Sequence, residues 1–295
     1  MTGLSMLNFF SGPDEVPLLA SLCEELGNFE RFWIGEHHAP SQVSDALTIA
    51  MITAATTKSI RVGTGAVSLT FRNPYMIAES AFLAELLVPG RIDLGVTRAA
   101  GTSKELTQLL LDCVDVKTVE AEYENRVRLL RALLQREESK IPGYLEKKVN
   151  LGPPLFLMGL GAARGRLAGE LGLGLCSSFH HGGTIHTVRE TLEEYDAHFR
   201  PSALFPKPFK IVCISGQISD NPDEVRAAKQ DEERMKLNYT GVFSREISVY
   251  SSSKDGAAEV KQYGDAVKAD EMMFLPTGNP ASCAKALSSG WKLLK

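Results

Sequence analysis

Short apolar runs alternate with longer amphipathic segments along almost the whole chain. Several runs, such as those in PLFLMG and KIVCIS, are unbroken apolar blocks, which is typical of parallel strands covered on both faces. We predict eight strands, at residues 5–10, 32–36, 61–69, 91–96, 155–159, 174–178, 209–217 and 271–275. Between them we predict eight helices, at residues 15–26, 45–57, 74–87, 118–136, 162–171, 187–199, 222–236 and 280–294.

Turn and capping residues support several of these helix boundaries. The segments DNPDE at 220–224 and TGNP at 277–280 each place a capping side chain before a proline in the first turn. Gly27 and Gly172 stand where the end of a helix needs a residue in the left-handed conformation.

Eight strand–helix units without a long linker predict an α/β protein. The expected fold is a (β/α)8 TIM barrel that forms a single domain over residues 1–295, and a doubly wound open sheet is its rival. Two of the intervals between predicted strands are long: the one between the fourth and fifth strands and the one before the eighth. The first contains a predicted hairpin at 141–150, and the second, residues 238–268, is predicted to be an irregular insertion. Such intervals form either lids over a substrate or surface excursions.

Composition narrows the choice of partner and compartment. The 295 residues are 44% hydrophobic and 23% charged with a formal charge of −4, which gives no basic field for nucleic acid or an anionic membrane. No signal peptide is recognisable, and no apolar run approaches the roughly 20 residues of a membrane span. The five cysteines are odd in number and lack CxxC spacing, which disfavours a disulfide framework or structural zinc. We expect a cytoplasmic protein with buried thiols.

The segment WIGEHH, residues 33–38, ends the second predicted strand with an acid and two histidines. Barrel enzymes carry their chemistry at the carboxyl ends of strands, and imidazole suits proton transfer near neutral pH. Adjacent histidines on a strand face opposite ways, so His37 and His38 are poorly placed to bind one metal. The alternative is one hydrogen-bonded and one exposed histidine without a function, but the position at a strand end favours a function.

The next two strands carry residues suited to a flat or anionic ligand. The third, RVGTGAVSL, has small residues at Gly63, Gly65 and Ala66, which either admit a ligand to the backbone or allow tight packing. The fourth, within PGRIDLGVTRAAGT, places Arg98 at its carboxyl end, where a guanidinium can grip a phosphate or carboxylate with two hydrogen bonds.

The turn MGLGAARG, residues 158–165, joins the fifth strand to a helix. Free N–H groups at a helix start bind anions, and Arg164 adds positive charge. A dinucleotide site is disfavoured, because Arg164 stands where GxGxxG needs its third glycine and no acid ends the next strand. The turn therefore indicates one phosphate, as in a mononucleotide. The loop SSFHHGG at 177–183 is a weaker candidate for contact with a ring or substrate, with an ordinary polar loop as the default.

In this order, these segments resemble the luciferase-like flavin monooxygenase family. The resemblance covers most of the barrel and is most specific in the combination of GEHH with PGRIDLG and Arg98. It runs through residues 33–38, 61–69, 78–79, 90–98, 157–172 and 274–287. It is closest to the short single-chain members associated with bacterial secondary metabolism.

The resemblance implies where the ring of a flavin would lie. His37 corresponds to the family's active-site histidine near the reactive edge of the flavin. Gly65-Ala66 corresponds to a non-proline cis peptide against which the isoalloxazine packs. Ser177 and Ser178 fall in the strand that borders the ring.

It also implies the phosphate site. Arg98 corresponds to a phosphate-binding arginine, and Leu160 and Gly161 to backbone donors to the same phosphate. Arg164 stands where many relatives have a hydroxyl residue, so the hydrogen bonding there must differ.

The implied activity is a monooxygenase that acts on a small organic or secondary-metabolite substrate with O2 and reduced FMN from a separate reductase, as a homodimer through helices 46–57 and 74–87. The alternatives are a deazaflavin-dependent oxidoreductase, a non-catalytic flavin-binding protein and an unrelated sugar-phosphate barrel. The chain is shorter than many relatives in the loops that shape the substrate pocket, so the resemblance leaves the substrate open.

Overall fold

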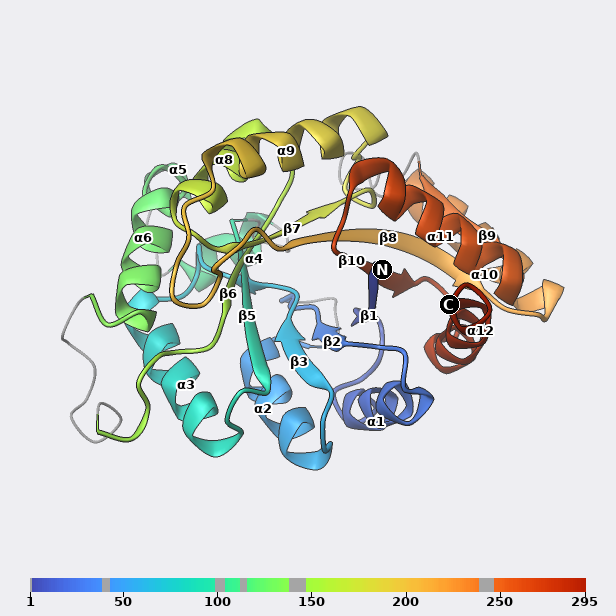
Figure 1. Cartoon of the computed structure of the whole chain (residues 1–295), viewed down its shortest axis with the longest axis horizontal. Helices are drawn as coiled ribbons and strands as arrows, with labels where there is room; N and C mark the ends of the chain where they lie inside the picture. Colours follow the sequence, from blue (N-terminus) through green and yellow to red (C-terminus); the bar gives the residue numbers. More distant parts are fainter. Residues whose placement is uncertain (1, 39–42, 99–103, 112–115, 138–146, 239–246) are drawn as a thin grey trace.

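The computed structural model describes residues 2–38, 43–98, 104–111, 116–137, 147–238 and 247–295, which form a parallel barrel enclosed by helices (Figure 1). Eight strands make the barrel: β1 (Gly3–Asn8), β2 (Arg31–Ile34), β3 (Arg61–Thr64), β5 (Ile92–Thr97), β6 (Leu155–Met158), β7 (Gly174–Ser178), β8 (Lys210–Ile218) and β10 (Glu271–Pro276). Two short strands, β4 (Val67–Ser68) and β9 (Ser248–Ser251), pair with β5 and β8. All eight predicted strands are confirmed.

The barrel closes because β10 pairs with both β1 and β8. The pairing is parallel, with Met6 of β1 beside Phe274 and Cys213 of β8 beside Met273. The predicted (β/α)8 TIM barrel is therefore confirmed, and the open-sheet alternative is wrong.

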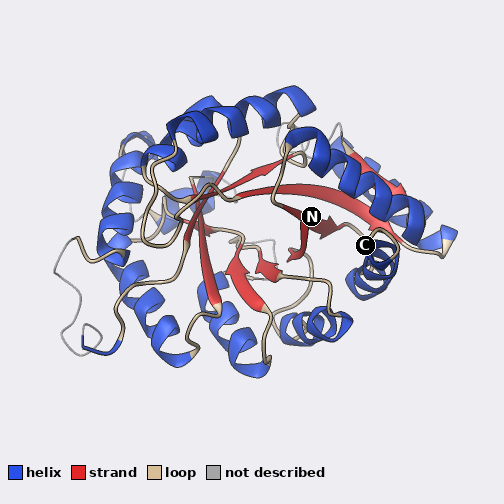
Figure 2. Ribbon diagram, in the orientation of Figure 1, coloured by secondary structure: helices blue, strands red, loops and turns tan. Residues whose placement is uncertain are grey.

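Helices cover the outside of the barrel (Figure 2). They are α1 (Val16–Leu26), α2 (Ala46–Thr56), α3 (Pro74–Leu87), α4 (Lys104–Leu110), α5 (Val116–Ala121), α6 (Tyr123–Leu134), α8 (Ala162–Glu170), α9 (Ile185–His198), α10 (Pro222–Asn238), α11 (Ser253–Val267) and α12 (Pro280–Lys292). The expected end signals hold: Asn279 Oδ1 accepts the N–H of Ser282 at 3.0 Å, and Gly27 follows α1 with φ of 71°. The helix predicted at 118–136 is divided into α5 and α6.

The prediction of an irregular insertion at residues 238–268 is wrong for the described part, which contains β9 and α11. Ser252 caps α11 by accepting the N–H of Asp255. A β-carbon on Gly256 would lie 2.8 Å from the Ile218 side chain, so this glycine allows the helix to approach β8. The serines and glycines of this region belong to β9, to the cap of α11 and to the close contact between α11 and β8. Residues 239–246, and 141–146 of the predicted hairpin, lie outside the described residues.

Large side chains fill the interior of the barrel and close its amino-terminal end. The Trp33 and Phe156 rings pack edge to face with centroids 5.3 Å apart. Below them Arg31 and Arg61 bond to the buried carboxylate of Asp93, at 3.0 and 2.7 Å. The accessible end of the barrel is consequently at the carboxyl ends of the strands.

The described part of the chain contains four of the five cysteines. Cys23, Cys176, Cys213 and Cys283 are buried and are not joined in disulfides, and burial raises the pKa of Cys283 to about 12. Cys113 lies outside the described residues. None of the described helices has the length and apolar character needed to cross a membrane. Within the same residues, no group of three or more His, Cys, Asp or Glu side chains is arranged to hold a metal ion.

Candidate functional site

A cavity opens at the carboxyl ends of the barrel strands. Its wall is mostly apolar or sulfur-containing, with one carboxylate and three imidazoles converging on it. The lining residues are Leu7, Phe9, Glu36, His37, Gly65, Ala66, Thr97, Met158, Gly159, Cys176, Ser178, His180, His181, Cys213 and Met273. This composition is typical of a site for a small organic ligand.

His37 follows β2 and lines this cavity. Its backbone N–H donates to the carbonyl of Val43 at 2.9 Å, and its ring stands edge-on to Phe9, with centroids 4.5 Å apart. Burial lowers the pKa of the His37 imidazole below its ordinary value, and His38 lowers it further by charge repulsion. At neutral pH the neutral imidazole is therefore favoured, and in that form it can accept a proton.

Glu36 ties the end of β2 to its neighbours. Its carboxylate accepts the N–H groups of Ala46 on α2 and Ser68 on β4, at 3.1 and 3.2 Å, and pairs with Arg72 at 3.1 Å. Burial raises the pKa of the Glu36 carboxyl, against the opposing effects of Arg72 and the two backbone donors. These bonds fix the segment from which His37 projects.

The peptide bond between Gly65 and Ala66 is cis, and both residues line the cavity. The Gly65 N–H donates to the Ile34 carbonyl at 2.6 Å. A β-carbon on Gly63 would lie 2.2 Å from the Trp33 ring, so the small residue there serves packing. The two interpretations of this glycine-rich segment thus hold at different positions, packing at Gly63 and cavity wall at Gly65-Ala66.

Arg98, Arg164 and Tyr123 form a basic cluster beside the cavity. Arg98 follows Thr97, a cavity residue, and the Arg164 guanidinium carbon lies 4.6 Å from the centroid of the Tyr123 ring. The charges of both arginines act on the Tyr123 hydroxyl, whose pKa is raised by burial. No described residue forms a hydrogen bond with that hydroxyl. The structure therefore brings together two predicted arginines around a buried phenol.

The turn before α8 lies next to this basic cluster. Gly161 has φ of 103°, which residues with a β-carbon rarely adopt. Its N–H donates to Thr191 Oγ1 at 2.8 Å and is therefore used within the protein. The N–H groups of Leu160, Ala162 and Ala163 have no acceptor among the described residues, which leaves a helix start able to bind an anion.

Ser177 and Ser178 lie on opposite faces of β7, as alternation along a strand requires. Ser178 lines the cavity, and its Oγ lies 3.1 Å from Nδ1 of His181. Ser177 is fully buried, and its hydroxyl has no hydrogen-bond partner among the described residues. Of the two, Ser178 is the serine that borders the described cavity.

Sequence reasoning missed Tyr123 entirely. In the sequence it is one aromatic residue within the charged helix predicted at 118–136, and nothing there marks its hydroxyl as part of a site. Met158, Cys213 and Met273 were also missed as cavity residues, because strand side chains that point into a barrel look the same whether they fill the core or line a site.

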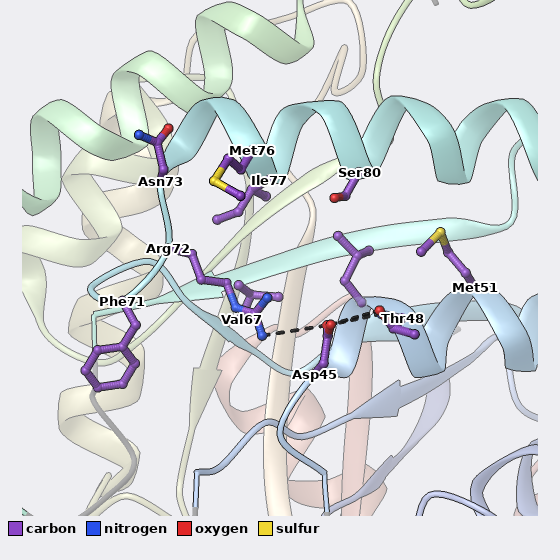
Figure 3. Close-up of a pocket in the computed structure, with 11 residues that line it drawn as sticks. Asp45, Thr48, Met51, Val67, Phe71, Arg72, Asn73, Met76, Ile77 and Ser80 are labelled. Atoms are coloured by element: carbon purple, nitrogen blue, oxygen red, sulfur yellow. Dashed lines mark hydrogen bonds and ion pairs between the residues drawn. The ribbon is translucent and has the colours of Figure 1, made fainter. Parts of the chain in front are cut away.

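A second hollow lies on the outside of the barrel between α2 and α3 (Figure 3). Asp45 caps α2 and pairs with Arg72 at 3.6 Å across this hollow. Met76 on α3 is 66% exposed beside it. The hollow does not share residues with the cavity that His37 lines.

The sequence has relatives among characterised and uncharacterised bacterial proteins. It is 31% identical over 213 residues to a luciferase-like monooxygenase of Escherichia coli strain K12, across 69% of this chain and 60% of that protein. It is 28% identical over 191 residues to N-acetyl-S-alkylcysteine monooxygenase of Bacillus subtilis, across 63% of this chain and 56% of the relative. The matched part of the chain thus spans about 60% of the length of such relatives.

Solved structures share the fold across the whole chain. Apo-MsnO8 superposes with a TM-score of 0.82 at 24% identity, over 99% of both chains. The oxygenating constituent of 3,6-diketocamphane monooxygenase from Pseudomonas putida, in complex with FMN, has a TM-score of 0.66 at 14% identity, over 99% of this chain and 96% of the other. An F420-dependent secondary alcohol dehydrogenase has a TM-score of 0.73 at 15% identity, over 100% and 99%, so the fold alone does not choose the cofactor. Residues 5–290 match the family model for luciferase-like monooxygenases, and the chain belongs to that family.

Proposed function

We propose that the protein is a monooxygenase that uses reduced FMN and O2 to oxygenate a small organic compound or secondary metabolite. This proposal rests on one observation: an apolar cavity and a basic cluster lie side by side at one end of the barrel. His37 and the cis Gly65-Ala66 peptide lie on the cavity wall, and the basic cluster lies beside it. A flat ring suits the first part and a single phosphate the second.

The residues present fit the phosphate of FMN. Arg98, Arg164 and the N–H groups of Leu160 and Ala162 would hold it, and the Tyr123 hydroxyl would complete the set. The buried Tyr123 hydroxyl has no hydrogen-bond partner among the described residues, which supports this assignment because buried hydroxyl groups ordinarily have one. Gly161 would shape the turn rather than donate, since its N–H already bonds to Thr191.

Gly65, Ala66 and Ser178 would hold the ring, and His37 would lie nearest the reacting atoms. Bound reduced FMN would supply two electrons to a net reaction that also consumes two protons, in which one atom of O2 enters the substrate and the other leaves as water. The chain holds the ligand, excludes water with apolar side chains such as Phe9, and accepts a proton at a ring nitrogen of His37.

The reduced flavin would come from a separate reductase in the cytoplasm. The turn at 158–165 has the features of a site for one phosphate and lacks those of a dinucleotide site, which supports delivery of electrons by FMN itself. Buried free thiols such as Cys23 fit a reducing compartment. We place this activity in a single barrel domain over residues 1–295.

A homodimer through α2 and α3 is part of the proposal. Ile52, Met76, Leu83 and Leu87 on these helices are 48%, 66%, 42% and 63% exposed, a concentration of apolar surface that a partner subunit would cover. Light scattering on the purified protein tests this, and a monomer at micromolar concentration would contradict it.

Titration with FMN, followed by flavin fluorescence, tests the cofactor, with riboflavin as the matched ligand that lacks the phosphate. We expect Arg98→Met to weaken FMN binding about 10- to 100-fold, since charge-assisted hydrogen bonds contribute about 1.5–3 kcal/mol each. Riboflavin binding should stay unchanged in this variant. Absence of FMN binding by the folded wild-type protein would overturn the proposal.

Oxygen consumption separates the proposal from its main alternative, a deazaflavin-dependent hydride transfer on the same fold. With FMN, NADH and a flavin reductase, substrate-dependent oxygen uptake above the rate of the reductase alone is expected. A deazaflavin enzyme would turn over without consuming oxygen.

A further inference from the structure

The cavity carries a second pair of imidazoles, His180 and His181, on the loop after β7. In the closed barrel β2 and β7 are opposite strands, with three barrel strands between them on either side. The second pair therefore lies on the wall that faces His37. A ligand in the cavity would lie between the two walls.

The loop that carries this pair is tightly folded onto β7. The Gly183 N–H donates to the Phe179 carbonyl at 3.2 Å, and a β-carbon on Gly183 would lie 2.2 Å from the Ser178 carbonyl oxygen. Thr184 then starts α9 with a reciprocal hydrogen-bonded cap to Thr187. The turn and the cap together fix the position of the two histidines relative to the strand end.

Ser178 connects the outer histidine of the pair to the cavity. His181 is exposed to solvent, whereas Ser178 is only 7% exposed and lines the cavity. Ser178 Oγ lies 3.1 Å from His181 Nδ1. The His180 and His181 rings are in contact, with centroids 3.9 Å apart, so the buried His180 supports the outer ring.

A hydroxyl group can accept one proton while it gives up another. Protonated His181 can therefore pass its Nδ1 proton to Ser178 Oγ while the original Ser178 proton moves to an acceptor in the cavity. Ser178 is unchanged at the end of the transfer, and His181 recovers a proton from water because it is exposed.

We propose that His181, through Ser178, is the proton entry of the site; this rests on the proposed function. When reduced FMN is bound as its anion, FMNH⁻, substrate and O2 need one further proton to give oxidised FMN, the oxygenated product and one water. His37 is poorly suited to supply that proton, because its surroundings favour its neutral form. His181 supplies it, and His180 is a positioning residue.

Other titratable groups line the same cavity and bear on any pH dependence. Glu36 and His37 face the cavity from the end of β2, Cys176 from β7 and Cys213 from β8. Glu36 is paired with Arg72, and burial raises the pKa of Cys176, so neither supplies a proton-exchanging group in contact with water. His181 is the exposed imidazole of this set.

Ser178→Ala and His181→Gln test the proton entry, with the exposed helix residue change His186→Gln as the matched control. We expect both test variants to lower reductase-coupled turnover about 10- to 100-fold at pH 8, where protons are scarce, and less at pH 6. Free imidazole added to His181→Gln should restore part of the rate. FMN affinity should change little in His181→Gln, and His186→Gln should match the wild type.

A second readout does not depend on turnover. In the flavin-free protein, the ¹⁵N signal of His181 Nδ1 should shift in Ser178→Ala, whereas the His186 signals should not. If the wild type binds no FMN, the proposed function fails and this inference with it. If the wild type binds FMN and turns over, but both variants keep its pH profile, the proton entry alone is overturned.

Discussion

Two histidine pairs stand on opposite walls of one cavity, and their surroundings differ in almost every respect. In the first, His37 is partly buried against Phe9, and His38 is edge-on to a different ring, that of Phe71. In the second, the rings of His180 and His181 are in mutual contact and the outer one meets solvent. A buried imidazole with a lowered pKa suits proton acceptance, and an exposed one suits exchange with water.

The two pairs are also held by different means. The first depends on charge, because the buried Glu36 carboxylate joins β2 to α2, β4 and Arg72. The second depends on backbone geometry, through the close approach of Gly183 to β7 and the cap at Thr184. Loss of a charge around Glu36 should consequently have a pH-dependent effect on stability, whereas a larger side chain at Gly183 should disturb the second wall at any pH.

The largest effect is expected from His37→Asn, which removes the proton acceptor of the first wall. Turnover should fall about 10²- to 10⁴-fold, the usual contribution of a positioned acid or base, while FMN affinity changes only a few-fold. Steady-state kinetics and flavin titration check the two quantities separately. The acid limb of the pH–rate profile should disappear with the imidazole.

The control for His37→Asn is His181→Gln, on the second wall. His181→Gln should keep the acid limb and lose rate mainly at high pH. If His37→Asn retained wild-type turnover, or if both variants changed the same limb, the assignment of different roles to the two walls would be wrong.

Arg72→Met should have an intermediate effect, on stability. Glu36 would lose its cationic partner, and the free energy of unfolding should fall by about 1–3 kcal/mol at pH 8. The pKa of Glu36 is already raised by burial, and loss of Arg72 raises it further. A carboxyl whose folded pKa is raised loses stability as pH rises through that pKa, so the deficit should be smaller at pH 5.

Urea unfolding at the two pH values measures this difference. Arg226→Met, at an exposed arginine whose ion pair with Asp223 is on the surface, is the matched control and should change stability little at either pH. An equal loss at pH 5 and pH 8 in Arg72→Met would show that Glu36 is not the group responsible.

The fold follows from sequence where burial makes the pattern simple. Barrel strands covered on both faces appear as apolar blocks, so all eight were found, together with caps such as Asn279. The region of β9 and α11 was missed for two reasons. The strand β9 is short and lies outside the barrel, and Gly256 and Gly264 do not mark turns but let α11 approach β8 and β10. Its serines and glycines carry no apolar period strong enough to show a strand and a helix.

The site follows from sequence only where a residue type and its position agree. The structure places His37, just after β2, and Ser178, at the end of β7, on the cavity wall. Tyr123 was not found, because only the packing of α6 against α8, 40 residues further along the chain, brings its ring under Arg164. The use of the Gly161 N–H by Thr191 was equally invisible, since no local pattern links residues 30 positions apart.

The smallest effect is expected from His38→Gln, because His38 is not one of the residues that line the cavity and acts on His37 through its charge. Burial is the larger cause of the lowered His37 pKa and remains, but the repulsion from His38 is removed. The pKa of His37 should therefore rise part of the way towards its ordinary value, and the acid limb of kcat/KM should move to higher pH. The behaviour above pH 7, assigned to His181 on the opposite wall, should not move. A shift of both limbs would mean that the two pairs titrate as one coupled group, and a shift of the acid limb to lower pH would mean that His38 stabilises the protonated form of His37 through Glu36.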